Sequence, residues 1–197
     1  LSPRKSVSSR RERQATQPSI EFMQVSKVRS RYPSMQRGSL RGIPVHDNHK
    51  GDMMEIALTW YGHSAFRLDV DEDVVLIDPF LTDNAFAPVS AEEVEADYIV
   101  ITHGHGDHVG DAVSIAQRTG ALVISNFEIC NWLQTQGVDR VHPQHIGGGY
   151  SHPFGYLKLT IAHHGSSLPD GSYGGNPAGL LLTCGEDVLY FAGDTGL

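Results

Sequence analysis

Four side chains that could bind a metal ion lie within six residues of one short stretch of the sequence. The stretch runs from Thr102 to Gly110 and carries His103, His105, Asp107 and His108. Side chains alternate along an extended backbone, so His103 and His105 point to the same side and can converge on one ion. Imidazole nitrogen and carboxylate oxygen together suit zinc, manganese or iron better than calcium. We therefore predict a metal-binding loop rather than a solvated, histidine-rich one.

The glycines between these ligands suggest how a second ion is bound. Gly104 and Gly106 permit positive φ and a close approach of the backbone, so the chain can fold around the first ion. Asp107 and His108 would then point from a different direction. We predict that this second pair reaches a second ion.

Apolar runs that could form strands lead into the loop and into two other polar segments. Residues 98–101 precede the loop, residues 156–162 end in His163 and His164, and residues 188–192 end in Gly193 and Asp194. Three strand ends therefore present His or Asp. An α/β scaffold assembles sites from distant residues at its strand ends in this way.

The remaining pattern predicts the elements that position these ends. Strands are expected at 56–61, 65–70 and 74–77 as an antiparallel meander, then at 121–124, with a hairpin of 180–184 and 188–192. One helix is expected over 109–119, and a second should run to Gln136 from a capping box of Ser125 and Glu128. Residues 141–155 are expected to be a loop with His142, His145 and His152 at its surface. This order of elements indicates an α/β protein with helices packed on a sheet.

Charge is distributed unevenly along the 197 residues. Residues 1–51 contain eleven Lys or Arg against three acids, whereas residues 52–197 contain four against twenty. Because phosphate contacts need many basic side chains, we expect no nucleic-acid binding by the acidic part. Residues 1–52 are predicted to be a disordered basic leader, either an organelle-targeting peptide or a non-native extension, and residues 53–197 to be one domain.

The cysteines indicate the cellular compartment, and the length of the apolar runs indicates whether the chain could span a membrane. Cys130 and Cys184 show no paired spacing, so two reduced thiols in the cytoplasm are expected. No apolar run approaches the about 18 residues that a membrane-spanning helix needs. We expect a protein without a membrane span.

Several of these stretches together resemble the metallo-β-lactamase superfamily, in particular its small metal-dependent hydrolases similar to lactonases and phospholipase-D-type members. The matching segments are residues 59–66 (TWYGHSAF), 77–80 (IDPF), 102–110 (THGHGDHVG), 126–128 (NFE), 164–167 (HGSS), 174–179 (GGNPAG) and 192–196 (AGDTG). The resemblance covers about residues 55–196. It implies a four-layer αββα sandwich and two divalent ions, zinc or alternatively manganese or iron.

The resemblance also implies a role for each ligand. The first ion would be held by three histidines, and the second by Asp107 and His108, while Asp194 would bridge both unless it is only a turn aspartate. The three histidines are His103, His105 and His164. Asp78 would orient the histidine loop or be a turn former before Pro79.

Two further residues have weaker roles by resemblance. His63 would line the pocket or be a structural turn histidine. Asn176, in the glycine-rich stretch 171–179, would belong to a mobile substrate loop or to a simple turn.

The implied activity is hydrolysis of a small ester, lactone or phosphodiester by metal-bound hydroxide. Asp107 would be the catalytic carboxylate that holds the hydroxide and passes its proton to the leaving group. Members of the superfamily supply a last histidine to the second ion from a further strand and helix, and this sequence stops at Leu197. We therefore expect a fragment with the C-terminal part of the sandwich missing and the second site short of one ligand. A metal-binding but catalytically inactive fragment is the alternative to an active hydrolase, and a nuclease is a weaker one.

Overall fold

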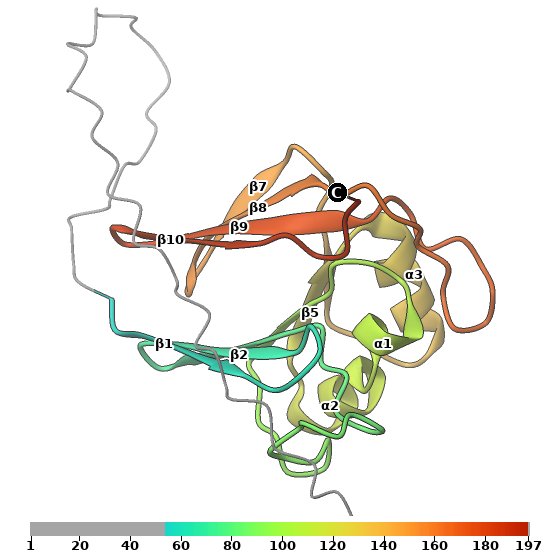
Figure 1. Ribbon diagram of the computed structural model, residues 1–197, viewed down its shortest axis with the longest axis horizontal. Coiled ribbons are helices and arrows are strands. Elements are labelled where there is room, and N and C mark those ends of the chain that lie inside the picture. Colours follow the sequence, from blue (N-terminus) through green and yellow to red (C-terminus); the bar gives the residue numbers. More distant parts are fainter. Residues whose placement is uncertain (1–53, 197) are drawn as a thin grey trace, which may run out of the picture.

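The computed structural model describes residues 54–196, which form two β-sheets and three helices (Figure 1). The predicted disorder of residues 1–52 lies outside the described residues. Strands from widely separated parts of the chain alternate with helices, so the α/β class is confirmed.

The first sheet has six strands in the order β1-β2-β3-β4-β5-β6. Its first three strands form the predicted antiparallel meander, and β3 to β6 then pair in parallel. Parallel neighbours need a crossover connection, and helices supply it here between β4 and β5 and between β5 and β6. The strands are β1 (Ile56–Trp60), β2 (Phe66–Val70), β3 (Asp73–Ile77), β4 (Tyr98–Val100), β5 (Leu122–Ser125) and β6 (Val141–Pro143).

The second sheet is antiparallel throughout, in the order β10-β9-β8-β7. Its strands are β7 (Gly149–His152), β8 (Gly155–Ile161), β9 (Ala178–Cys184) and β10 (Asp187–Phe191). The predicted hairpin is confirmed as β9 and β10. The predicted loop over 141–155 is wrong, because it contains β6 and β7, two short strands whose pairing with β5 and β8 outweighs their polar composition.

One of the three histidines predicted at the surface of that loop is buried. His145 is exposed as expected and His142 is partly buried, but His152 is buried. The His152 ring stacks on Phe154 with an interplanar angle of 2°, and its Nε2 atom has no hydrogen-bond partner. His152 is therefore part of the packing between the sheets.

The helix predicted over 109–119 begins only at Ala112, and a separate short helix precedes it. The helices α1 (Gly106–Val109) and α2 (Ala112–Thr119) are separated at Gly110, which has φ of 45°. A Cβ atom on Gly110 would lie 2.6 Å from Phe80 Cα and from the Pro79 carbonyl oxygen. The chain turns there because it runs against the segment that follows β3.

The third helix, α3 (Phe127–Thr135), begins one residue later than the capping box predicts. Asn126 is its N-cap, and the Asn126 side-chain oxygen accepts a hydrogen bond from the Ile129 amide. The hydroxyl of Ser125 instead donates to the carbonyl of Ile101. Both residue types cap helices, and the burial of Ser125 against β4 decides between them.

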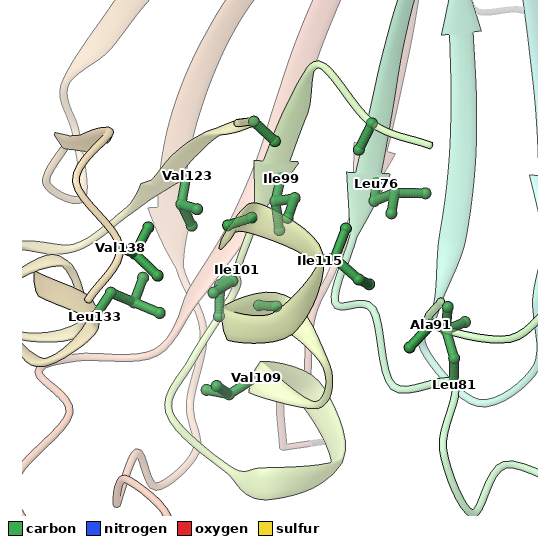
Figure 2. Packing of buried hydrophobic residues seen from close by; sticks show 14 of the residues in the cluster. Leu76, Leu81, Ala91, Ile99, Ile101, Val109, Ile115, Val123, Leu133 and Val138 are labelled. Atoms are coloured by element: carbon green, nitrogen blue, oxygen red, sulfur yellow. The ribbon is translucent and has the colours of Figure 1, made fainter. Parts of the chain in front are cut away.

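Two hydrophobic cores hold these layers together. One lies between the helices and the first sheet and includes Leu76, Ile99 and Val123, which Figure 2 shows beside Ile115 of α2. The other lies between the two sheets, where residues next in sequence to these, such as Val75, Val100 and Ile124, meet Leu157, Leu159 and Leu180. The central strands are thus buried on both faces, as parallel strands require.

The described residues make three layers of the expected four: helices, first sheet and second sheet. Within residues 54–196 no helix covers the outer face of the second sheet, which carries exposed Tyr156, Val188 and Tyr190. No helix among the described residues is long and apolar enough to cross a membrane.

Candidate metal centre

The residues that follow five strands, three of the first sheet and two of the second, supply the side chains of the site. Pairing makes β1 parallel to β3 and β4, and makes β8 parallel to β10. The segments after these strands contain His63, Asp78, residues 102–108, His164 and Asp194. The predicted convergence of separate strand ends is therefore present in the fold.

The first group of possible ligands consists of His103, His105 and His164, whose candidate ligand atoms lie within 4.8 Å of one another. His103 Nε2 and His105 Nδ1 are 3.1 Å apart. Two atoms bound tetrahedrally at zinc distances are about 3.3 Å apart. The spacing therefore fits one ion, and the alternation of His103 and His105 along the chain produces it as predicted.

Asp194 lies between this group and a second one. Its Oδ2 is 3.5 Å from His164 Nε2, and its Oδ1 is 3.4 Å from His108 Nε2. The ligand atoms of His103, His108 and Asp194 also lie within 4.8 Å of one another. One carboxylate thus faces histidines of both groups, which is the geometry of a bridging ligand.

His108 fits a metal ligand for a reason that does not depend on spacing. Its Nδ1 donates to Asp78 Oδ2 at 2.8 Å, both side chains are buried, and its Nε2 is a buried atom without a hydrogen-bond partner. Metal-binding histidines typically donate their other ring N–H to a carboxylate, which fixes the tautomer and the ring orientation. In its neutral form His108 therefore has a lone pair on Nε2, the atom that faces Asp194.

Asp78 reaches the other histidine of the loop through Thr102. Its Oδ1 accepts from the Thr102 amide at 2.8 Å, and its Oδ2 accepts from the Thr102 hydroxyl at 2.6 Å. The same hydroxyl is 3.0 Å from His103 Nδ1 and, having donated to the carboxylate, accepts from that nitrogen. Asp78 therefore orients His103 as well as His108. No pattern in the sequence indicates that Thr102 links Asp78 to His103.

The protonation of the buried histidines differs with their partners. Burial, with the neighbouring imidazoles of His108 and His105, lowers the pKa of His103 to about 3. Burial also lowers the pKa of His108, but its hydrogen bond to Asp78 and the nearby carboxylates outweigh this and raise it. Burial acts to raise the pKa of Asp107, yet its backbone hydrogen bond, His108 and His63 together lower it. His103 is thus neutral and Asp107 ionised at neutral pH.

The glycines of the loop act differently from the prediction. Neither Gly104 nor Gly106 has positive φ, so that expectation is wrong. The chain turns because α1 begins at Gly106, which places Asp107 and His108 in its first turns. Close approach is confirmed at Gly104, where a Cβ atom would lie 3.2 Å from the Ser167 carbonyl and the amide donates to the Ser166 hydroxyl.

His63 and Asn176 occupy different surroundings. His63 Nε2 lies 3.1 Å from Asp107 Oδ2, and the two form a further group of possible ligands with His108. Asn176 is exposed, its side chain accepts from the Tyr173 hydroxyl, and it belongs to none of the ligand groups found among residues 54–196. A lone histidine in a turn carries no sequence signal that would place it beside Asp107.

The chain is similar in sequence to a known protein family and to several individual proteins. Residues 74–197 match the family described as the beta-lactamase superfamily domain. A UPF0173 metal-dependent hydrolase of Carboxydothermus hydrogenoformans is 51% identical over 142 residues, which cover 71% of this chain and 62% of the relative. A UPF0173 metal-dependent hydrolase of Bacillus cereus is 46% identical over 145 residues, covering 71% and 63%. The chain therefore spans less than two thirds of these relatives.

A solved structure extends the likeness to three dimensions. Igni18, described as a novel metallo hydrolase from the hyperthermophilic archaeon Ignicoccus hospitalis, superposes with a TM-score of 0.62 at 37% identity, covering 72% of this chain and 62% of that one. The matched sequence includes the histidine loop, His164 and Asp194. The chain belongs to the beta-lactamase superfamily.

Proposed function

We propose that this chain carries the metal centre of a hydrolase that uses two divalent cations to cleave a small ester, lactone or phosphodiester. The proposal rests mainly on the position of Asp194. One of its carboxylate oxygens faces His164 of the first group of possible ligands, and the other faces His108 of the second. The names of the relatives, metal-dependent hydrolases, support the reaction class. Zinc is the proposed metal, with manganese and iron as alternatives that accept the same ligands.

Each side chain has a proposed task at this centre. His103, His105 and His164 would hold the first ion, Asp107 and His108 the second, and Asp194 both. Ions bound there would lower the pKa of water and polarise a carbonyl or phosphoryl oxygen. Asp107 is exposed and ionised, so its carboxylate can accept a proton from water and pass it to the leaving group.

Metal content tests the site itself. Elemental analysis of the dialysed 1–197 chain should find two ions per chain, and His103→Ala or His105→Ala should lose the first. His145→Ala is a matched control, because His145 is exposed and belongs to none of the ligand groups among the described residues. Unchanged metal content in both site variants would contradict the proposal.

Turnover distinguishes the hydrolase from the alternative of a metal-binding but inactive chain. Generic esters, lactones and phosphodiesters would be assayed with added zinc or manganese, with His103→Ala as the blank. Metal binding without turnover above that blank would favour the inactive alternative. We further propose a cytoplasmic location, because Cys130 and Cys184 are both buried free thiols.

A further inference from the structure

The ring of His63 lies beside Asp107 and His108, the second pair of possible ligands. Its Nε2 lies 3.1 Å from Asp107 Oδ2, the same separation as that of His103 Nε2 and His105 Nδ1 in the first group. The ligand atoms of His63, Asp107 and His108 all lie within 4.8 Å of one another. The His63 and His108 rings meet edge to face, with centroids 5.1 Å apart.

The backbone at His63 is held in an unfavourable conformation that aims the ring at this position. Its φ is 49°, in the left-handed region that residues other than glycine seldom occupy. The turn is fixed from both sides: the Trp60 indole donates to the His63 carbonyl at 2.9 Å, and the Tyr61 amide donates to the Ala65 carbonyl at 2.8 Å. Such strain persists where surrounding contacts impose it, and it is frequent at functional sites.

An ordinary ion pair explains this arrangement poorly. The His63 and Asp107 side chains are 40% and 50% exposed, and a pair so accessible to water contributes little to stability. The ring also has Phe80 against it, at a centroid distance of 5.9 Å, which restricts its movement. A restrained imidazole next to an ionised carboxylate and the lone pair of His108 matches the mixed nitrogen and oxygen set that zinc prefers.

We propose that His63 is a ligand of the second ion, binding through Nε2 beside Asp107 and His108. The proposal rests on the two-metal site proposed above, and it gives that second site a histidine from the turn between β1 and β2. The prediction of a pocket-lining or structural turn histidine would then be replaced by direct coordination.

The test compares ligand variants in the full 1–197 chain. Binding of zinc would be followed by titration calorimetry and elemental analysis in wild type, His63→Asn, His108→Ala and His145→Ala. Asparagine tolerates the left-handed backbone at position 63 but is too short to place a ligand atom where Nε2 lies. Cobalt substitution adds a spectroscopic readout, because visible absorption reports the number and type of ligands.

The expected result is a second equivalent bound about tenfold or more weakly in His63→Asn, with the first equivalent unchanged. The visible spectrum of the second cobalt equivalent should change as well, whereas His145→Ala should match wild type. A second equivalent that binds His63→Asn as in wild type, while His108→Ala loses it, would overturn the role of His63 and leave the two-metal site intact. A wild-type chain that binds fewer than two ions would overturn both proposals.

Discussion

Replacing Asp78 by asparagine isolates the contribution of one buried carboxylate to metal affinity. Asp78 accepts three hydrogen bonds, from the Thr102 amide, the Thr102 hydroxyl and His108 Nδ1. An amide has one acceptor oxygen and one donor nitrogen in these places, so at least one of these donors loses its partner. The substitution should affect the His108 ring most, because the Asp78 carboxylate fixes the tautomer of that ring.

The expected loss of metal affinity follows from the hydrogen bond between Asp78 and the candidate ligand His108. Removing such a partner of a metal-binding histidine weakens metal affinity by about 10- to 100-fold, equivalent to about 1.4 to 2.7 kcal/mol. At saturating metal the same difference appears in stability, because a tighter ion raises the free energy of unfolding further. Asp78→Asn should therefore lower zinc affinity by that factor and reduce the metal-induced rise in unfolding free energy by the same amount.

Asp111→Asn is the matched control. Asp111 also accepts three hydrogen bonds, from the amides of Leu81 and Thr82 and from the Thr82 hydroxyl, but it contacts no histidine of the site. Both variants should lose stability without metal, since hydrogen bonds to charged groups contribute about 1.5 to 3 kcal/mol each. Chelator competition and urea unfolding measure the two quantities. Equal losses of zinc affinity in both variants, or none in Asp78→Asn, would refute the role given to Asp78.

Three other predictions concern stability and reactivity. Burial lowers the pKa of His152 from 6.5 to about 4, so between these pH values the unfolded chain binds more protons and the free energy of unfolding decreases by up to about 3 kcal/mol as the pH is lowered; His152→Phe should flatten this part of the slope in urea titrations at pH 4 to 7. Burial raises the pKa of the Cys130 and Cys184 thiols to about 12, so a disulfide reagent at pH 8 should label them only after unfolding, and rapid labelling of the native chain would contradict this. Asn126→Ala removes the cap of α3 and should lower the unfolding free energy by about 1 to 2 kcal/mol, whereas Asn176→Ala, at an exposed position, should change it by less than about 0.5 kcal/mol in the same urea experiment.

The proximity of His103 and His105 could be predicted because local geometry determines it. Alternation along extended backbone places His103 and His105 together, and apolar runs mark the strands that deliver His164 and Asp194. Strand and hairpin positions followed from the same pattern. The strand positions and the proximity of His103 to His105 depend on neighbours in sequence, whereas the roles of His164 and Asp194 were implied by the family resemblance.

The features that were missed depend on partners far away in the chain. The polar segment around β6 and β7 forms strands only because β5 and β8 offer free edges. His63 reaches Asp107, 44 residues away, through a turn whose φ no composition rule specifies. The choice of Asn126 over Ser125 as N-cap likewise depends on the carbonyl of Ile101, which lies 24 residues from Ser125.

The hydrogen bonds of Asp78 make the two ligand groups one unit rather than two independent sites. Asp78 holds His108 directly and His103 through Thr102, and the two rings lie with centroids only 4.0 Å apart in the buried interior. It is unfavourable for two imidazoles this close and this buried to be cationic together, which is consistent with the lowered pKa of His103. Because His103 is neutral at neutral pH, it does not have to release a proton when a metal ion binds. Protons therefore do not weaken metal binding at this residue of the first group. His108, whose pKa is raised, can bind through Nε2 only in its neutral form, so protons compete with metal at this ligand more than at His103. Filling of the centre should therefore begin at the first group, and the bound cation should then favour the neutral form of His108 that the second group requires.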